Sequence, residues 1–192
     1  MNMRVEKMIR PAVVCLIVMT LLCGIIYPLA ITGAAHIFFP QAANGSIITV
    51  TLKDGTTKDY GSGLIAQTFT EPQYMIGRPN LTGSSGPSNL SPASEMEKSL
   101  VQDRMDWLHE LDPKNTADIP SDLVTVSGSG VDPNISPEAA EYQVNRISLE
   151  RGIQEEEVRD IIDKYTTARL LGFWGEPAVN VLKVNLALDG FL

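Results

Sequence analysis

The 192-residue chain is poor in cysteine and histidine, which excludes several kinds of site. Its two cysteines, Cys15 and Cys23, lie in one apolar stretch, where eight residues of helix would separate them by about 12 Å, too far for a disulfide. The two histidines, His36 and His109, stand in no metal-ligand spacing. The sequence therefore predicts neither an intramolecular disulfide nor a transition-metal site.

Motifs for catalysis and nucleotide binding are also missing or incomplete. No G-x-x-x-x-G-K-[ST] phosphate loop is present, and residues 128–130 lack the G-x-S-x-G frame because Ser127 and Val131 flank them. Residues 61–66 match G-x-G-x-x-A, but a hairpin pattern precedes them instead of the strand of a parallel crossover. A Ser-His-acid triad in the region after the apolar stretch would have to use His109, and the acidic residues are read as a solvated face.

Charge is absent between Arg10 and Lys53, and Pro11–Phe39 is dominated by Val, Leu, Ile, Ala and Met. A bilayer core needs roughly 20 such residues, so residues 11–39 are predicted to form a transmembrane helix. Pro28 and Gly33 allow a kink or an early end. Three small residues would allow another helix to approach closely: Gly24, Gly33 and Ala34.

The charges flanking this segment predict its orientation. Residues 1–10 carry three basic side chains and one acid, a net charge of +2, whereas the chain after the segment carries 12 basic and 22 acidic residues, a net charge of −10. Basic residues beside a span stay cytoplasmic, so residues 1–10 are predicted inside and 40–192 outside, as an extracytoplasmic domain. The acidity argues against nucleic acid and anionic lipid as partners.

Two other interpretations of the apolar segment remain. A cleaved signal peptide has an apolar stretch of about 7–15 residues, roughly half of what is present, although Ala30 or Ala34-Ala35 offers a small-residue cleavage site. Attachment of lipid at Cys23 is disfavoured, because it follows Leu22 and more apolar chain comes after it. An uncleaved anchor is the preferred interpretation.

The outer region predicts an α+β domain. Alternation of Ile48, Val50 and Leu52 before Asp54-Gly55 indicates a hairpin, and Ser94 is predicted to cap a helix. In chain order the predicted elements are a hairpin over 45–61, a short helix over 62–69, a loop over 79–94, a helix over 94–112, an extended run over 123–126, helices over 136–152 and 154–166, and a strand over 182–188.

A serine- and glycine-rich stretch before the 136–152 helix is the main candidate docking or structural motif. Asp132 has two interpretations: an Asx-type turn residue that steers the chain into the helix, or a contact for a cation or for a partner's basic group. The residues of this motif are Ser127, Gly128, Ser129, Gly130, Asp132, Pro133, Ser136 and Pro137.

Ile119–Ile147, with its sequence IPSDLVTVSGSGVDPNISPEAAEYQVNRI, resembles the signature of the C subunit of the Kdp-type potassium-transporting P-type ATPase. The resemblance extends in order over nearly the whole chain. Four further segments resemble that family: Asp54–Phe69, Tyr74–Asn80, Ser85–Ser94 and Leu170–Leu188.

The resemblance implies a non-catalytic accessory subunit of an ATP-driven potassium uptake pump. In that family one partner carries the phosphorylated aspartate and hydrolyses ATP, and another conducts potassium, so ATP and potassium would be handled by the complex and this chain would hold no cofactor of its own. The family is described as a catalytic chaperone that raises the ATP affinity of the hydrolysing subunit. With about ten residues predicted in the cytoplasm, that effect should pass through the membrane parts as a coupling between sites.

The mechanism we expect is a clamp, with the span packed among the pump's membrane helices and the acidic domain over the external mouth of the potassium-conducting subunit, where it attracts cations. Two alternatives remain open from the residues alone. One is a membrane-tethered external hydrolase that depends on His109, and the other is a tethered solute-binding domain that acts without partners.

Overall fold

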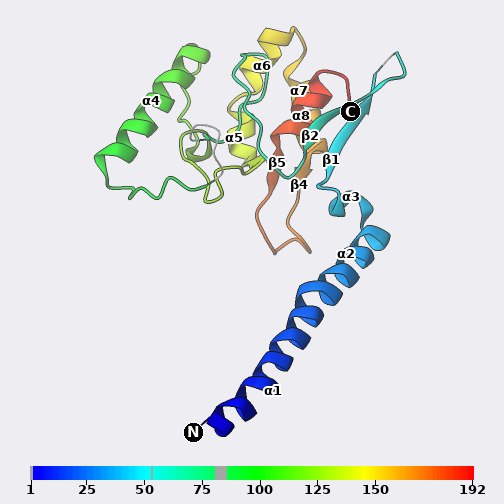
Figure 1. Cartoon of the computed structure of the whole chain (residues 1–192). Helices are drawn as coiled ribbons and strands as arrows, with labels where there is room; N and C mark the ends of the chain where they lie inside the picture. Colours follow the sequence, from blue (N-terminus) through cyan, green and yellow to red (C-terminus); the bar gives the residue numbers. More distant parts are fainter. Residues whose placement is uncertain (1, 53, 81–85) are drawn as a thin grey trace. The chain divides into compact units, whose positions relative to one another are not determined.

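The computed structural model describes residues 2–52, 54–80 and 86–192, which divide into two compact units, Met1–Ile47 and Ile48–Leu192 (Figure 1). The first unit is helical, and its segment Lys7–Phe38 is long and apolar enough to cross a bilayer. The elements of this unit are α1 (Asn2–Leu21), the π-helical turn η1 (Leu22–Ile26), α2 (Tyr27–Phe38) and the short α3 (Pro40–Ala43).

The predicted possibility of an early helix end at Pro28 is wrong, because the helix continues to Phe38. A wide turn precedes the proline, and the N–H of Tyr27 donates to the carbonyl of Leu22 five residues back. Pro28 has no N–H to donate to the carbonyl four residues before it. A π turn at this point lets the helix continue in spite of the missing hydrogen bond.

The second unit combines two small sheets with several short helices. Strands β1 and β2 form a two-stranded sheet, and the other three form an antiparallel sheet in the order β3-β5-β4, with Val179 opposite Ile135 on one side and Thr166 on the other. The strands are β1 (Ile47–Thr51), β2 (Thr57–Ser62), β3 (Asn134–Ile135), β4 (Thr166–Thr167) and β5 (Ala178–Asn180). The helices are α4 (Glu95–Leu111), the 3-10 turn η2 (Ser121–Leu123), α5 (Pro137–Glu141), α6 (Val144–Arg151), α7 (Glu155–Lys164) and α8 (Val181–Leu188).

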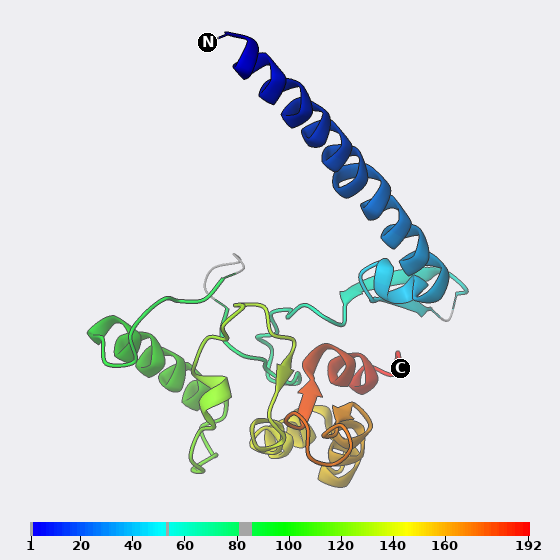
Figure 2. The ribbon, with the colours of Figure 1, turned by 90° about the horizontal axis from the view of Figure 1, so that it is seen from below.

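The core of this unit lies between the three-stranded sheet and the helices around it. In Figures 1 and 2, α7 and α8 lie beside that sheet, and α4 lies on the opposite side of the unit. The main buried cluster consists of Met75, Leu108, Leu123, Ile135, Ala139, Ala140, Val144, Ile147, Val158, Ile162, Val179, Val181 and Val184. Burial of these apolar side chains is the principal stabilising term for a domain without disulfides.

Local capping signals predicted several elements correctly. The hairpin forms as β1 and β2, with Gly55 at φ +83° in its turn. The Ser94 hydroxyl accepts the N–H of Glu97 at the start of α4, and α7 lies within its predicted range. Part of the predicted 79–94 loop, residues 81–85, lies outside the described residues.

The predicted carboxy-terminal strand is wrong, because residues 181–188 form helix α8. Asn180 caps this helix by accepting the N–H of Lys183, and the side chains of Val181, Leu182, Val184, Asn185 and Leu186 are all buried. A short helix buried on most of its circumference shows no regular polar face, so its sequence resembled the alternation of a strand.

Three other predictions are also corrected. The 62–69 segment turns without forming a helix, because the hydroxyl of Ser62 accepts the N–H of Leu64. The 123–126 segment is not extended, because Leu123 ends a 3-10 turn and the hydroxyl of Thr125 donates to the carbonyl of Ser121. The predicted 136–152 helix is two helices. The side-chain amide of Gln143 donates to the carbonyl of Ala139, and the backbone N–H of Gln143 donates to the carbonyl of Ala140 instead of that of Ala139.

Candidate functional site

A pair of buried side-chain amides holds the 72–78 segment against the helices. The N–H of Met75 donates to Asn185 Oδ1 (2.8 Å), and Asn185 Nδ2 donates to the Met75 carbonyl (2.9 Å). Gln143 does the same for Ile76, with distances of 2.7 and 3.0 Å. The two amides satisfy backbone groups that a neighbouring strand would otherwise pair, so we call Gln143 and Asn185 the amide latch.

Arg146 extends the latch from α6. Its Nη2 donates to Gln143 Oε1 (2.8 Å), and its Nη1 donates to the carbonyls of Pro72 and Tyr74. Burial lowers the pKa of Arg146 to about 10. The guanidinium therefore stays charged at neutral pH, and the carbonyls compensate part of its desolvation.

Arg151 fixes the other end of the same segment. Its guanidinium donates to the carbonyls of Gln73 and Leu188, each at 2.7 Å, and to a carboxylate oxygen of Asp189 at 2.8 Å. The Tyr74 hydroxyl donates to the second oxygen of Asp189 (3.2 Å). Burial, and then the charge of Asp189, raises the pKa of Tyr74.

The 72–78 segment, which the amide latch holds in place, positions Arg78 beside the serine-glycine stretch. Arg78 Nη2 lies 3.4 Å from the carbonyls of Thr125 and Val126, and Arg78 Nη1 lies 3.9 Å from Asp132 Oδ2. Asp132 also accepts the N–H of Asn134 at 3.0 Å, which is the Asx-type turn. Asp132 thus forms the predicted turn, and the basic group beside it belongs to its own chain. Its role as a contact for a cation or a partner stays a prediction.

The Ser127–Gly130 bend is a backbone turn in this structure. The Gly130 N–H donates to the Ser127 carbonyl, the two hydroxyls of Ser127 and Ser129 lie 3.3 Å apart, and the Ser129 carbonyl accepts the N–H of Gly86. Gly130 has φ +70°, and an added Cβ would lie 2.2 Å from the Gly86 carbonyl oxygen, whereas Gly128 faces open space. These contacts make the bend a docking point for another loop of the domain.

The end of the candidate motif starts helix α5. The hydroxyl of Ser136 accepts the N–H of Ala139 (3.2 Å), Pro137 occupies the first turn, and the N–H of Ser136 donates to Asp122 Oδ2 (2.6 Å). The carbonyl of Pro133 accepts the N–H of Val181 and so joins the motif to α8. The predicted motif residues are therefore brought together, as a structural junction between loops and helices.

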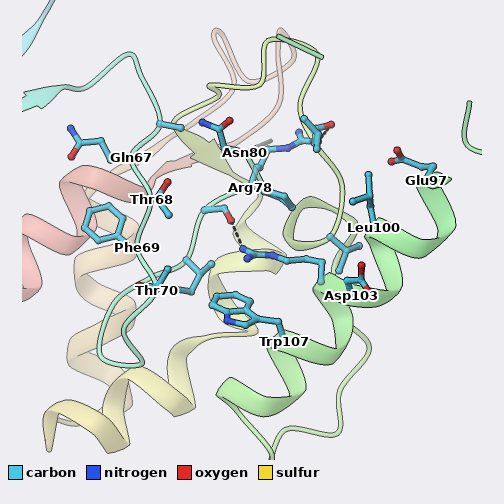
Figure 3. A pocket seen from close by; sticks show the side chains of 17 residues that line it. Gln67, Thr68, Phe69, Thr70, Arg78, Asn80, Glu97, Leu100, Asp103 and Trp107 are labelled. Atoms are coloured by element: carbon cyan, nitrogen blue, oxygen red, sulfur yellow. Dashed lines mark hydrogen bonds between the residues drawn. The ribbon is translucent and has the colours of Figure 1, made fainter. Parts of the chain in front are cut away.

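A pocket of about 390 Å³ lies beside this junction, between the 66–70 segment and α4 (Figure 3). Trp107 packs under the guanidinium of Arg104 at 4.1 Å, and Arg104 also donates to the carbonyls of Leu123 and Gly77. Burial lowers the pKa of Arg104 to about 10. Aromatic, guanidinium and carboxylate groups line the pocket, including the labelled Phe69, Arg78, Asn80, Glu97, Asp103 and Trp107.

The described residues offer contacts for binding in this region but assemble no catalytic apparatus. No group of three His, Cys, Asp or Glu side chains that could hold a metal occurs among them. His109 is exposed on α4, and no hydrogen bond joins it to a serine or an acid in the part of the chain that the structure describes. The geometry therefore gives no support to the hydrolase alternative.

The small residues of the helical unit are not buried: Gly24 and Gly33 are exposed, and Ala34 is half-buried. Gly24 falls in η1, and Gly33 and Ala34 fall in α2. No residue of these two elements is buried, and an added Cβ at Gly33 would meet no atom within 4 Å. Space for a closely packed neighbour is present, and the role of these residues stays a prediction.

The sequence analysis missed the amide latch and a second feature, the apolar end of the hairpin between β4 and β5. Four large side chains of that hairpin are exposed: Leu170 (67%), Leu171 (79%), Phe173 (71%) and Trp174 (70%). The run LLGFW, which carries no charge, was available as a signal for it. For the amide latch, the only sequence signal was that Gln143 and Asn185 are polar residues on helix faces that are otherwise apolar.

Comparisons with known proteins match the sequence of this chain over almost its full length. The family model described as "K+-transporting ATPase, c chain" matches residues 9–190. The chain is 57% identical over 180 residues to the potassium-transporting ATPase KdpC subunit of Listeria monocytogenes serovar 1/2a, covering 94% of each chain. It is 50% identical over 200 residues to the KdpC subunit of Clostridium perfringens, covering 97% and 98%, and 48% identical over 187 residues to that of a Janthinobacterium species, covering 94% and 96%.

Proposed function

Because the chain belongs to the KdpC family of K+-transporting ATPase subunits, we propose that it acts as a clamp that stabilises the assembled pump. A KdpC subunit is a component of a complex and not an enzyme by itself. The observation that carries the proposal is the apolar helix, in which no residue of η1 or α2 is buried. Such a helix gains most by packing against other membrane helices.

The partners we propose are the potassium-conducting and the ATP-hydrolysing subunits of the same pump. The positive charge before the span and the acidity after it support an orientation with residues 1–10 in the cytoplasm and 40–192 outside. Over the external mouth of the conducting subunit, a net charge of −10 raises the local concentration of potassium by a modest factor that salt screens.

The family's effect on ATP affinity is then an indirect one. ATP is cytoplasmic, whereas residues 40–192 lie outside in the proposed orientation. The helix therefore raises ATP affinity by stabilising, through its packing, the pump conformation that binds nucleotide, which is a coupling between two distant sites.

Gentle-detergent purification of the tagged full chain tests the clamp. We expect the potassium-conducting and the ATP-hydrolysing subunits to co-elute with it, and the eluate to hydrolyse ATP faster when potassium is added. Recovery of the chain alone, from cells that produce the other subunits, would contradict the proposal. The ATP effect is tested separately, by comparing the KM for ATP of pumps purified with and without the chain.

A further inference from the structure

The hairpin between β4 and β5 ends in an apolar tip, which we define as Leu170–Trp174. Its four large side chains are 67–79% exposed. Leu171 has φ +55°, an uncommon backbone conformation for a bulky residue, and Gly172 follows it at φ +81°. A strained turn that exposes apolar side chains to water costs free energy unless these side chains are buried in another apolar environment.

The tip is formed in advance of any binding. The N–H of Leu170 donates to the Trp174 carbonyl (2.8 Å), and the N–H of Trp174 donates to the Leu170 carbonyl (3.0 Å). At the base of the tip, the guanidinium of Arg169 pairs with the carboxylate of Glu176 at 2.7 Å, so the two flanking charges cancel. Little conformational entropy remains to be lost when this tip binds.

A short covalent linker joins one end of the domain to the apolar helix. Within the second unit, the β4–β5 hairpin and the amino end of β1 extend toward the same end of the domain (Figure 1). From the amino end of β1 the chain continues through residues 39–46 to the apolar helix. Eight residues reach at most about 30 Å when fully extended, so the linker limits the distance between the amino end of β1 and the helix end to about that length.

The chemistry of the tip matches the interfacial zone of a lipid bilayer. Tryptophan, phenylalanine and leucine are the side chains that bury at the boundary between headgroups and acyl chains. The domain's net charge of −10 opposes attraction to anionic headgroups, so apolar insertion has to supply the binding. Electrostatic attachment, the common alternative for a peripheral domain, is thereby disfavoured.

We propose that the tip Leu170–Trp174 inserts into the interface of the bilayer that the chain's own helix spans. The inserted tip is a second membrane contact, and it restricts the tilt of the domain relative to the membrane plane. This inference requires only that the helix lies in a membrane, and it holds for either orientation of the chain. The proposal of tip insertion can be wrong while the clamp proposal is right, because the two proposals depend on different contacts.

Tryptophan quenching in nanodiscs that contain the full chain tests the insertion. The chain has two tryptophans, so Trp107→Phe leaves Trp174 as the only reporter. With lipids brominated near the headgroup, we expect this variant to lose about half or more of its emission, because an interfacial ring lies within 5–10 Å of the boundary. The matched variant Trp174→Phe reports from Trp107 on α4 and should lose little.

A second pair of variants separates insertion from misfolding. Leu171→Asp combined with Phe173→Asp in the Trp107→Phe background should remove most of the bromolipid quenching, whereas Leu149→Asp, an exposed leucine on α6, should leave it unchanged. Helical circular dichroism should be the same in both. Trp174 that is quenched by aqueous iodide and not by bromolipid would overturn the proposal. Protection from both quenchers in the assembled pump would also overturn it, by showing that the tip docks on another subunit.

Discussion

Asn185 bonds both backbone polar groups of Met75, although 110 residues separate the two in sequence. All the atoms involved are buried, so neither residue can exchange its partner for water. The amide thus joins α8 to the segment that carries Arg78, and the stability of the domain depends on it.

Asn185→Leu should therefore lower the free energy of unfolding by about 2–4 kcal/mol, since a buried N–H and a buried carbonyl lose their partners. Urea unfolding of the full chain in mild detergent, followed by circular dichroism, measures the change. Asn145→Leu is the matched control, because that amide bonds Glu155 at the surface of α6. An equal effect of the two substitutions would contradict the importance of the latch.

Gly130→Ala should destabilise the domain by about 1–3 kcal/mol, because alanine disfavours φ +70° and its Cβ would meet the backbone of Gly86. Gly128→Ala, two residues away in open space, should change stability by less than about 0.5 kcal/mol. The same urea titration compares them. If the two variants unfold at the same urea concentration, the close contact between the bend and Gly86 is not formed.

The acid stability of the domain should depend on Glu155. Its pKa lies below the ordinary value of 4.5, because its carboxylate accepts hydrogen bonds first from Asn145 and then from Arg159. A carboxyl with a depressed pKa stabilises the fold above its unfolded pKa, and this contribution is lost as the pH falls below about 4.5 toward the folded value. Glu155→Gln should make the free energy of unfolding depend less steeply on pH over that range.

Glu157→Gln is the control for this measurement, because it removes the same charge from the same first turn of α7 without breaking an ion pair among the described residues. Urea midpoints measured from neutral pH to about pH 3 give the comparison. Identical slopes for the two variants would show that the hydrogen bonds to Glu155 do not form in solution.

Gly33→Leu should reduce recovery of the pump with the tagged chain, because a leucine at this uncovered position prevents close helix packing. We expect a loss of about tenfold, which corresponds to about 1.4 kcal/mol of packing free energy. Ile25→Leu, which conserves side-chain volume in the same helix, is the control. Unchanged recovery of the partners would exclude Gly33 from the helix contact.

Charge reversal on α7 tests the attraction of cations. Glu157, Asp160 and Asp163 are exposed and form no ion pair among the described residues, so their replacement by lysine should raise the potassium concentration for half-maximal transport at low ionic strength. High ionic strength should abolish the difference, since salt screens exposed charges. An effect that persists in high salt would indicate altered folding or docking instead.

The sequence predicted the elements that depend on local signals. Ser94, Ser136 and Gly152 each mark a helix end through bonds or backbone angles that span only a few residues. The apolar segment was equally clear, because its length and lack of charge suffice. These features need no knowledge of what the chain packs against.

The amide latch and helix α8 could not be predicted from local pattern. Gln143 and Asn185 are polar residues whose partners lie 67 and 110 positions away, and a single sequence does not reveal such a pairing. Burial on most sides hid the helical period of α8. At Asp132 the turn interpretation was correct, yet the nearby Arg78 came from a distant segment.

The π turn at Leu22–Ile26 has a consequence for any mutational scan of the apolar helix. One additional residue in a turn advances every later side chain by about 100° relative to an uninterrupted α-helix. Positions before Leu22 and after Ile26 therefore belong to two helical wheels that are out of phase, and a stripe of sensitive positions should change sides midway along the segment. Residues that would share one face of an uninterrupted α-helix can thus contact two different neighbouring helices, one in each leaflet.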